Sequence, residues 1–246
     1  MPQAMDPAES GRAVALTPKS VAPRETPSVA LLGAPYVGKS TLFNLLTGLS
    51  QHVSGWPGAT VELRTGTHRR GDRCFEIVDL PAVYSLAANS PDEQVARDYI
   101  AGQRPDVVVV VLNATNLERT LYLVAEALEL PSPVVVAINM MDVAARNGMQ
   151  IEAHVLGAAL GVPVVATVAS RGDGVPDLME AIGLVADGKW PLVPKRPDLG
   201  PQLEEVIARI QALLGDDLSP SYPNRWLAMK LLEGDREVAE LAQARL

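Results

Sequence analysis

The sequence is poor in residues that would cross-link the chain or anchor it in a membrane. It has a single cysteine, Cys74, in 246 residues, which excludes an internal disulfide framework and fits a reducing compartment. Its longest apolar runs, such as residues 107–112, are far too short to cross a bilayer. No charged start followed by an apolar stretch marks a signal peptide. These absences predict a soluble, cytoplasmic chain.

Positive charge is also scarce. The chain has 21 lysine and arginine residues against 29 aspartate and glutamate residues, which gives a net charge of −8. A protein that binds nucleic acid would normally present a basic face, so this balance disfavours nucleic acid as a partner. The three histidines, His52, His68 and His154, are isolated from one another in the sequence. We expect them to be solvated or core residues rather than metal ligands.

What the chain does contain is an alternation of short apolar runs with helical patterns. Runs rich in β-branched residues occur at 28–32, 74–80, 106–113, 133–139 and 162–167. Helical patterns occur between them at 39–46, 117–130 and 152–160. This order predicts an α/β fold in which a mostly parallel sheet is flanked by helices on both faces. Residues 61–80 differ, because two strands around the RRGDR turn predict a hairpin that adds one antiparallel edge.

Composition divides the chain into three parts. Residues 1–27 contain five prolines and no aromatic residue, so we expect a flexible N-terminal extension. Residues 28–187 carry the α/β pattern. Four prolines in residues 190–201 indicate a linker or hinge. Apolar residues then recur at helical spacing, and we predict a linker and a small all-helical subdomain over residues 188–246.

The stretch GAPYVGKS matches the phosphate-binding pattern G-x-x-x-x-G-K-S/T. It follows a predicted strand and opens a predicted helix, the context in which backbone N–H groups bind phosphates. In this arrangement Lys39 would reach the β- and γ-phosphates, and Ser40 would ligate Mg²⁺. The predicted phosphate-site residues are Gly33, Ala34, Pro35, Tyr36, Val37, Gly38, Lys39, Ser40 and Thr41.

Two later segments indicate guanine as the base. The stretch NMMD follows a buried strand, at the edge of the sheet where such folds bind ligands. Asp142 can accept two N–H bonds from guanine, a donor pair that adenine lacks, and Asn139 can hold the loop together. A backbone N–H in residues 169–174 could meet guanine O6, although this segment also fits a simple turn. The predicted base-site residues are Asn139, Met140, Met141, Asp142, Ala169, Ser170 and Arg171.

Two further motifs complete the predicted site. Asp79 ends a strand in VDLPA, where it can hold Mg²⁺ through a water molecule. Thr60 in GWPGATVE is a candidate for closing over Mg²⁺ and the γ-phosphate, although a lone loop threonine also fits a solvated turn. These motifs add Gly58, Ala59, Thr60, Asp79, Leu80, Pro81 and Ala82, with Lys39, Thr60 and Ala82 as catalytic residues and Ser40, Thr60 and Asp79 as metal ligands. Five motifs in this order predict a switch that binds GTP or GDP with Mg²⁺.

Several stretches together resemble a known family. GWPGATVE, DLPAVYSL, SPDEQVARDYI, NATNLERTLYL, INMMD and YPNRWLAMKLLEGD are similar to the N-terminal cytoplasmic domain of bacterial ferrous iron transport protein B, over residues 28–246. The resemblance implies a GTPase domain, a helical domain akin to a nucleotide-dissociation inhibitor, and a membrane region that carries iron. The chain looks like an excised cytoplasmic part of such an inner-membrane protein. Its implied partners are guanine nucleotide and that membrane region, and homo-oligomerisation is left open.

The chain departs from the family pattern at the site itself. Tyr36 and Ala34 replace two usual asparagines, and in the family the amide at the position of Tyr36 helps to hold K⁺ beside the phosphates. Ala82 stands where the family has glycine. Its Cβ forbids the positive-φ states that glycine permits, unless the active conformer uses an ordinary φ, in which case alanine costs little. Val83 stands where many small GTPases place a glutamine that orients water. We therefore expect intact nucleotide binding, slow hydrolysis and little dependence on K⁺.

Two other functions stay open at this point. The departures at Tyr36, Ala82 and Val83 also fit a nucleotide-sensing module with negligible hydrolysis. A soluble ribosome-associated GTPase is a third reading, which the acidic charge and the helical tail disfavour.

Overall fold

The computed structural model describes residues 25–48, 51–55, 61–87, 89–215, 219 and 221–244. Nearly all of the expected extension at 1–27 lies outside the described residues. The candidate site residues Gly58, Ala59 and Thr60 also lie outside them.

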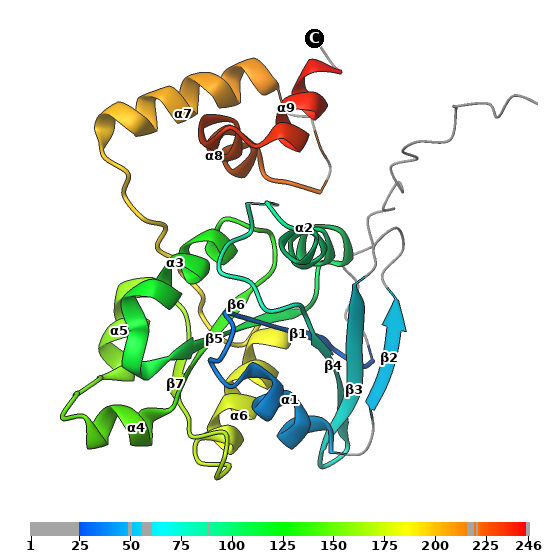
Figure 1. The fold of residues 1–246 in the computed structure, drawn as a ribbon, viewed down its shortest axis with the longest axis vertical. Helices are drawn as coiled ribbons and strands as arrows, with labels where there is room; N and C mark the ends of the chain where they lie inside the picture. Colours follow the sequence, from blue (N-terminus) through cyan, green and yellow to red (C-terminus); the bar gives the residue numbers. More distant parts are fainter. Residues whose placement is uncertain are drawn as a thin grey trace, which may run out of the picture.

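Within the described residues, the core is a seven-stranded sheet in the order β2-β3-β4-β1-β5-β6-β7 (Figure 1). The pairs β4–β1, β1–β5, β5–β6 and β6–β7 are parallel, which confirms the predicted mostly parallel sheet. The strands are β1 (Ser28–Gly33), β2 (Gln51–Gly55), β3 (Glu62–Arg70), β4 (Arg73–Asp79), β5 (Val107–Asn113), β6 (Val134–Asn139) and β7 (Val164–Ala166).

The antiparallel edge has one strand more than the predicted hairpin. β3 and β4 form that hairpin around Gly71, which has a φ of 60°. β2 then pairs with the free edge of β3, from Gln51 opposite Gly66 to Gly55 opposite Glu62. The QHVSG sequence of β2 has no apolar run that would predict a strand. It becomes one because β3 offers an unpaired row of backbone groups.

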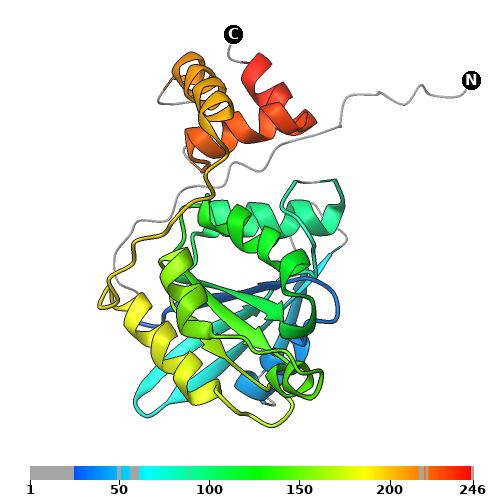
Figure 2. The same cartoon turned by 90° about the vertical axis from the view of Figure 1, so that its left-hand side faces the viewer.

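Helices cover both faces of the sheet, as the fold prediction requires (Figure 2). α1 (Lys39–Thr47) and α6 (Val175–Ala186) pack on one face. α2 (Pro91–Asp98), α3 (Leu117–Leu128) and α5 (Ala153–Leu160) pack on the other. β5 serves both faces, because successive side chains of a strand point to opposite sides. Its residues 107, 109 and 111 pack with α1 and α6, and residues 108, 110 and 112 with α2 and α3.

Three short elements connect these layers. A π-helical turn over Tyr99–Gln103 extends α2, and a 3₁₀ turn over Ala114–Asn116 leads from β5 into α3. α4 (Met141–Arg146) follows β6 directly. The helices α2, α4 and α6 were not among the helical patterns named from the sequence, and α2 and α4 are only eight and six residues long.

The C-terminal part is helical, as predicted. It consists of α7 (Pro201–Leu214), α8 (Asn224–Glu233) and α9 (Arg236–Gln243), which lie beyond the α2–α3 face of the sheet in Figure 1. Trp226, Leu227 and Val238 enter the same hydrophobic core as α2 and α3. Within the described residues, no helix combines the length and the apolar character needed to cross a bilayer.

The proline-rich linker is bound to the sheet domain. Residues 191–200 form no regular element, yet Val193 N–H donates to the carbonyl of Gly161 at 3.2 Å and Lys195 N–H to that of Leu160 at 2.8 Å. These bonds hold the linker along the end of α5. The predicted domain boundaries at residues 27/28 and 187/188 stay predictions.

Ion pairs join the helical part to the sheet domain. Lys230 of α8 donates at 2.7 Å to Glu126 of α3, and both side chains are at most 5% exposed. Burial raises the pKa of Glu126, and the Lys230 ammonium opposes that rise. Arg97 of α2, also buried, pairs with Asp235 at 3.2 Å and with Glu237, both at the start of α9. Charges that are out of water need such partners.

We predict that Lys230→Ala will lower the free energy of unfolding by about 3–5 kcal/mol, because it leaves the Glu126 carboxylate buried without its counter-charge. The matched control is Arg73→Ala, which breaks a 2.7 Å pair with Asp187 at the surface and should cost less than about 1 kcal/mol. Urea denaturation at neutral pH measures both. Equal losses in the two variants would contradict the prediction.

Candidate functional site

Packing explains both glycines of the GAPYVGKS loop, which joins β1 to α1. Gly38, the residue before α1, has a φ of 87°. A Cβ atom there would lie 2.2 Å from Asn139 Nδ2, so only glycine fits. A Cβ at Gly33 would lie 2.9 Å from the carbonyl oxygen of Val111 in β5. The loop is thus pressed against the carboxyl ends of its neighbouring strands.

Tyr36 projects out of this loop. Its side chain is 91% exposed, whereas Ala34 and Val37 on either side are buried. Its φ is 65°, a left-handed conformation that costs a residue with a Cβ about 1–2 kcal/mol. The phenol therefore points to solvent from a strained backbone, which an asparagine would adopt more readily.

Lys39 and Asp79 form a buried ion pair at the same edge of the sheet. Lys39 is 5% exposed and Asp79 7% exposed. The Lys39 ammonium donates to Asp79 Oδ1 and to the carbonyl of Leu80. The β1–β4 register, with Leu31 opposite Asp79, brings the end of β4 beside the start of the loop. A cation and a carboxylate of the predicted phosphate and metal site are thus in contact.

Arg64 is a neighbour of Asp79 that the sequence analysis missed. It lies opposite Asp79 in the β3–β4 register, with its guanidinium 3.9 Å from Asp79 Oδ2. It also donates to Asn44 Oδ1 at 3.0 Å and to Gln51 Oε1 at 2.6 Å, so it connects β3 to α1 and β2. Counting residue pairs outward from the hairpin turn would have placed it there.

Asn139 joins three of the predicted motifs. Its side-chain amide donates to the carbonyl of Val37 in the phosphate loop at 2.9 Å. Its Oδ1 accepts the Ala169 N–H at 2.9 Å and lies 3.4 Å from the hydroxyl of Thr167. The side chain is 4% exposed, so these contacts are shielded from water. Thr167 was not predicted as part of the site, and its only sequence signal is its place at the end of the last strand.

The residues predicted to read the base lie next to the Asn139 hub, by which we mean Asn139 with its contacts to Val37, Thr167 and Ala169. Met140 has a φ of 64° and precedes α4, so the chain turns sharply there. Asp142 lies in the first turn of α4 and contacts Arg146 at 3.3 Å. The Ala169 N–H already donates to Asn139 Oδ1. The backbone N–H of the next residue, the exposed Ser170, is therefore the better candidate for the predicted bond to guanine O6.

The residues after Asp79 return to the phosphate loop. The Val83 N–H donates to the Gly33 carbonyl at 3.1 Å, and the Val83 side chain is 3% exposed. Ala82 is exposed and is not among the positive-φ residues of the described chain. Of the two alternatives for Ala82, this conformation matches the one with an ordinary φ. Val83 is a core residue and offers no group to a water molecule.

The oxygen donors at this edge suit Mg²⁺, which prefers carboxylate, hydroxyl and phosphate oxygens. Ser40 is exposed at the start of α1, and Asp79 ends β4 beside it. In the part of the chain that the structure describes, no three His, Cys, Asp or Glu side chains group as they would around a metal ion. His68 Nδ1 instead lies 2.8 Å from the Leu46 carbonyl oxygen.

Comparison with known proteins gives the family. The profile of "Ferrous iron transport protein B" matches residues 27–182, and that of "FeoB cytosolic helical domain" matches residues 200–245. The chain belongs to the ferrous iron transport protein B family. It is 39% identical over 214 residues to the Fe(2+) transport protein A/Fe(2+) transporter FeoB fusion protein of Porphyromonas gingivalis, covering 85% of this chain and 25% of that protein. The chain spans 25% to 32% of the length of the curated relatives that it matches.

Solved structures of the family share the whole fold. The GDP form I of the cytosolic domain of T. maritima FeoB is 37% identical, with a TM-score of 0.83 over 91% of this chain and 86% of that one. A variant of the S. thermophilus NFeoB domain bound to GDP is 39% identical, with a TM-score of 0.77 over 87% and 82% of the two chains. The predicted P-loop GTPase fold with a helical subdomain is therefore confirmed.

We predict that Gly38→Ala will weaken the phosphate loop far more than Gly234→Ala. Both glycines have left-handed backbones, at φ 87° and 79°, so both variants bear the same conformational cost of about 1–2 kcal/mol. Only at Gly38 does the new Cβ meet Asn139 Nδ2, whereas Gly234 has open space. Displacing that buried amide should cost about 1–3 kcal/mol more. Urea denaturation tests this, and equal stability of the two variants would refute it.

Proposed function

We propose that this chain is the guanine-nucleotide-binding, slowly GTP-hydrolysing cytoplasmic domain of a membrane ferrous iron transporter. The observation that carries the proposal is the Asn139 hub, which joins the phosphate loop to the two segments predicted to read guanine. Membership of the family supports it, as do relatives whose structures contain GDP or GMPPNP. Because this chain spans only a part of those transporters, the iron-permeation region is a proposed partner.

The phosphate end of the site is proposed to use the loop of residues 33–41. Its N–H groups and the start of α1 would bind the β- and γ-phosphates, and Lys39 would turn from Asp79 toward them. Ser40, Asp79 and Thr60 would hold Mg²⁺, which when bound neutralises charge on the phosphate oxygens. Arg64 would keep Asp79 oriented once Lys39 has moved to the nucleotide.

The base end is proposed to read guanine through Asp142. Its carboxylate would accept the N1 and N2 hydrogens of the base, while Ser170 N–H would donate to O6. Asn139 would act as a positioning residue, because its own polar atoms already bind Val37 and Ala169. Met140 would lend an apolar surface beside the base.

Hydrolysis is proposed to be slow. The Ala82 N–H would bind the γ-phosphate from a backbone with an ordinary φ, whereas the buried Val83 side chain would not orient water. Tyr36 replaces the amide that would help to hold K⁺, and its side chain is 91% exposed. Transition-state charge would therefore be stabilised by Lys39, Mg²⁺ and backbone N–H groups alone.

Two alternatives follow from the same residues. A nucleotide-sensing module without hydrolysis would bind guanine nucleotide equally well and release no phosphate. A ribosome-associated GTPase is disfavoured by the family assignment and by the net charge of −8. Homo-oligomerisation is compatible with the proposal and is not required by it.

We predict that Asp142→Asn will weaken GTP binding by about 1–3 kcal/mol, because a charge-assisted pair of hydrogen bonds to the base is lost. The same change should favour xanthosine triphosphate, whose 2-oxo group accepts a bond from the new amide. Calorimetry with both nucleotides measures the exchange. Arg146→Ala, which removes the surface partner of Asp142, is the control and should keep guanine preference. Unchanged GTP affinity in Asp142→Asn would exclude this residue from the base site.

We predict slow multiple-turnover phosphate release at similar rates in KCl and NaCl, with Tyr36→Asn gaining a rate that depends on K⁺. The reason is that an amide at this position can fix a cation beside the β–γ bridge, which stabilises the transition state and leaves ground-state binding intact. Lys39→Ala should release no phosphate and shows that the activity belongs to this site. A wild-type rate strongly raised by K⁺ would overturn the prediction, and no release above the Lys39→Ala level would favour the sensing module.

A further inference from the structure

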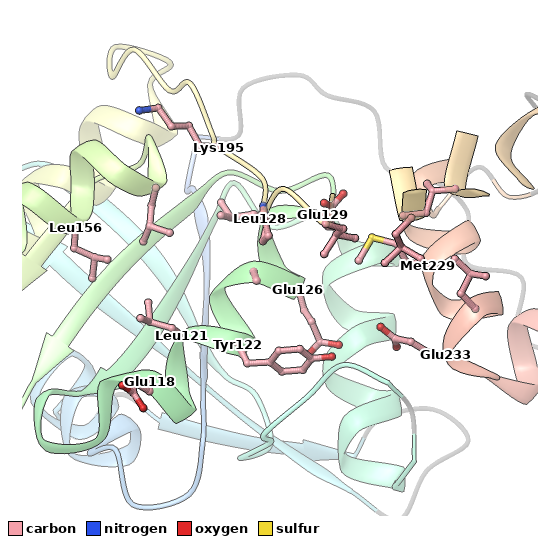
Figure 3. Close-up of a pocket in the computed structure, with 17 residues that line it drawn as sticks. Glu118, Leu121, Tyr122, Glu126, Leu128, Glu129, Leu156, Lys195, Met229 and Glu233 are labelled. Atoms are coloured by element: carbon pink, nitrogen blue, oxygen red, sulfur yellow. The ribbon is translucent and has the colours of Figure 1, made fainter. Parts of the chain in front are cut away.

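An apolar cavity lies at the junction of the sheet domain and the helical part. Its volume is about 630 Å³, and α3, the end of α5, the linker, α7 and α8 form its walls (Figure 3). None of its wall residues belongs to the nucleotide site described above. The apolar walls include Leu121, Leu128, Leu156, Leu160, Leu203 and Met229. Cavities of this size with mostly apolar walls and a few polar groups, placed between domains, are the usual form of small-molecule sites.

One side of the cavity is acidic. Glu118, Tyr122 and Glu126 are spaced four residues apart on α3, so they form one ridge along that helix. Glu233 of α8 faces the ridge, and Figure 3 shows Tyr122, Glu126 and Glu233 turned toward one another. Glu126 and Glu233 both accept from Lys230, each at 2.7 Å, so two carboxylates share a single ammonium group.

The remaining charges leave this side negative. Within the described residues Glu118 has no ion-pair partner. Glu129, also in the wall, is 2% exposed and lies 3.2 Å from Arg225 and 3.3 Å from Arg196. Among the described residues of the wall, Lys195 is the one cation, and it lies away from the acidic ridge (Figure 3). It donates to the carbonyl of Ala158 at 2.8 Å.

The cavity is open to solvent through an apolar rim. Tyr122, Leu203 and Leu232 are 51%, 41% and 44% exposed, so apolar surface continues from the inside to the outside. The rim gives a ligand a way in, and it also gives the free protein an apolar surface in water that a ligand would cover.

We propose that this cavity is a binding site for a small amphiphile with an apolar body and a protonated amine. The apolar body would occupy the leucine-lined space between α3, α5 and α7. The ammonium group would lie at the acidic ridge, where Tyr122 and Glu233 offer acceptors and the shared Lys230 leaves excess negative charge. An anionic head group would meet the carboxylates at the same place and be repelled.

Three probes with the same tail test the assignment: decylammonium, decanol and decanoate, each below its micelle concentration. Calorimetric titration of the full chain should show one site that binds decylammonium about tenfold more tightly than decanol and more tightly still than decanoate. Equal affinity for the three probes, or no binding of decylammonium, would overturn the proposal.

Two substitutions locate the site. Ala125→Trp fills the cavity from α3 and should abolish binding, whereas Ala159→Trp, the same change at an exposed position on α5 outside the cavity wall, should not. Glu118→Gln should weaken decylammonium about threefold and leave decanol unchanged, since it removes only charge. Binding that survives Ala125→Trp would place the probe elsewhere and refute the site.

Folding and nucleotide binding are followed separately. Circular dichroism and GDP titration on each variant show whether it is folded and whether the proposed nucleotide site is intact. If Ala125→Trp fails to fold, Leu203→Asn at the exposed rim replaces it, with the same expected loss of binding. Failure of GDP binding in the wild type would refute the proposed function, while the cavity would still be judged by the three probes.

Discussion

The side chain of Asn139 is the contact on which the arrangement of the candidate site depends. One amide group binds the Val37 carbonyl and the Ala169 N–H, so it fixes the distance between two loops that leave different strands. Gly38 packs against the same side chain, and Asn139 Nδ2 occupies the space that a Cβ atom at position 38 would need. The phosphate loop, Asn139 and the segment at Ala169 thus restrict one another's positions. A change in any of them moves the loop that is proposed to hold phosphates.

A second buried contact connects that site to the helical part. Glu126 accepts from Lys230 of α8 at 2.7 Å, and its other oxygen accepts the Leu86 N–H at 2.8 Å, only a few residues beyond Ala82. Ser85 also donates to it at 3.1 Å. Burial removes water from the Glu126 carboxylate, and three hydrogen-bond donors from the protein replace that water. The carboxylate therefore has little freedom to move independently of these donors. A shift of residues 82–86 would therefore move Glu126 and, through it, Lys230 of α8.

The parts of the fold that could be predicted are those with strong local signals. The valine run of β5 was predictable because a continuously apolar strand is typical of a sheet that is covered on both faces. The loop GAPYVGKS was predictable because its glycines stand at positions where a Cβ would not fit. β2 could not be predicted, since QHVSG forms a strand only when β3 is beside it. Arg64 and Thr167 carry no motif. Arg64 joins the site through the β3–β4 register, and Thr167 joins it through its hydrogen bonds just after β7. The predicted role of Thr60 lies beyond the described residues.

In the proposed function, nucleotide binding and GTP hydrolysis depend on different residues of the site. Holding a nucleotide is proposed to require the phosphate loop, Lys39 and Asn139, and the side chains of Lys39 and Asn139 are buried and hydrogen-bonded. Hydrolysis requires groups that face the reacting phosphate and stabilise charge only in the transition state. At the positions where such groups would stand, the chain has an exposed phenol at Tyr36 and a core side chain at Val83. The Val83 side chain is held in the core, whereas Tyr36 is exposed, so we expect that a single change at position 36 can alter the proposed hydrolysis without disturbing the packing of the loop.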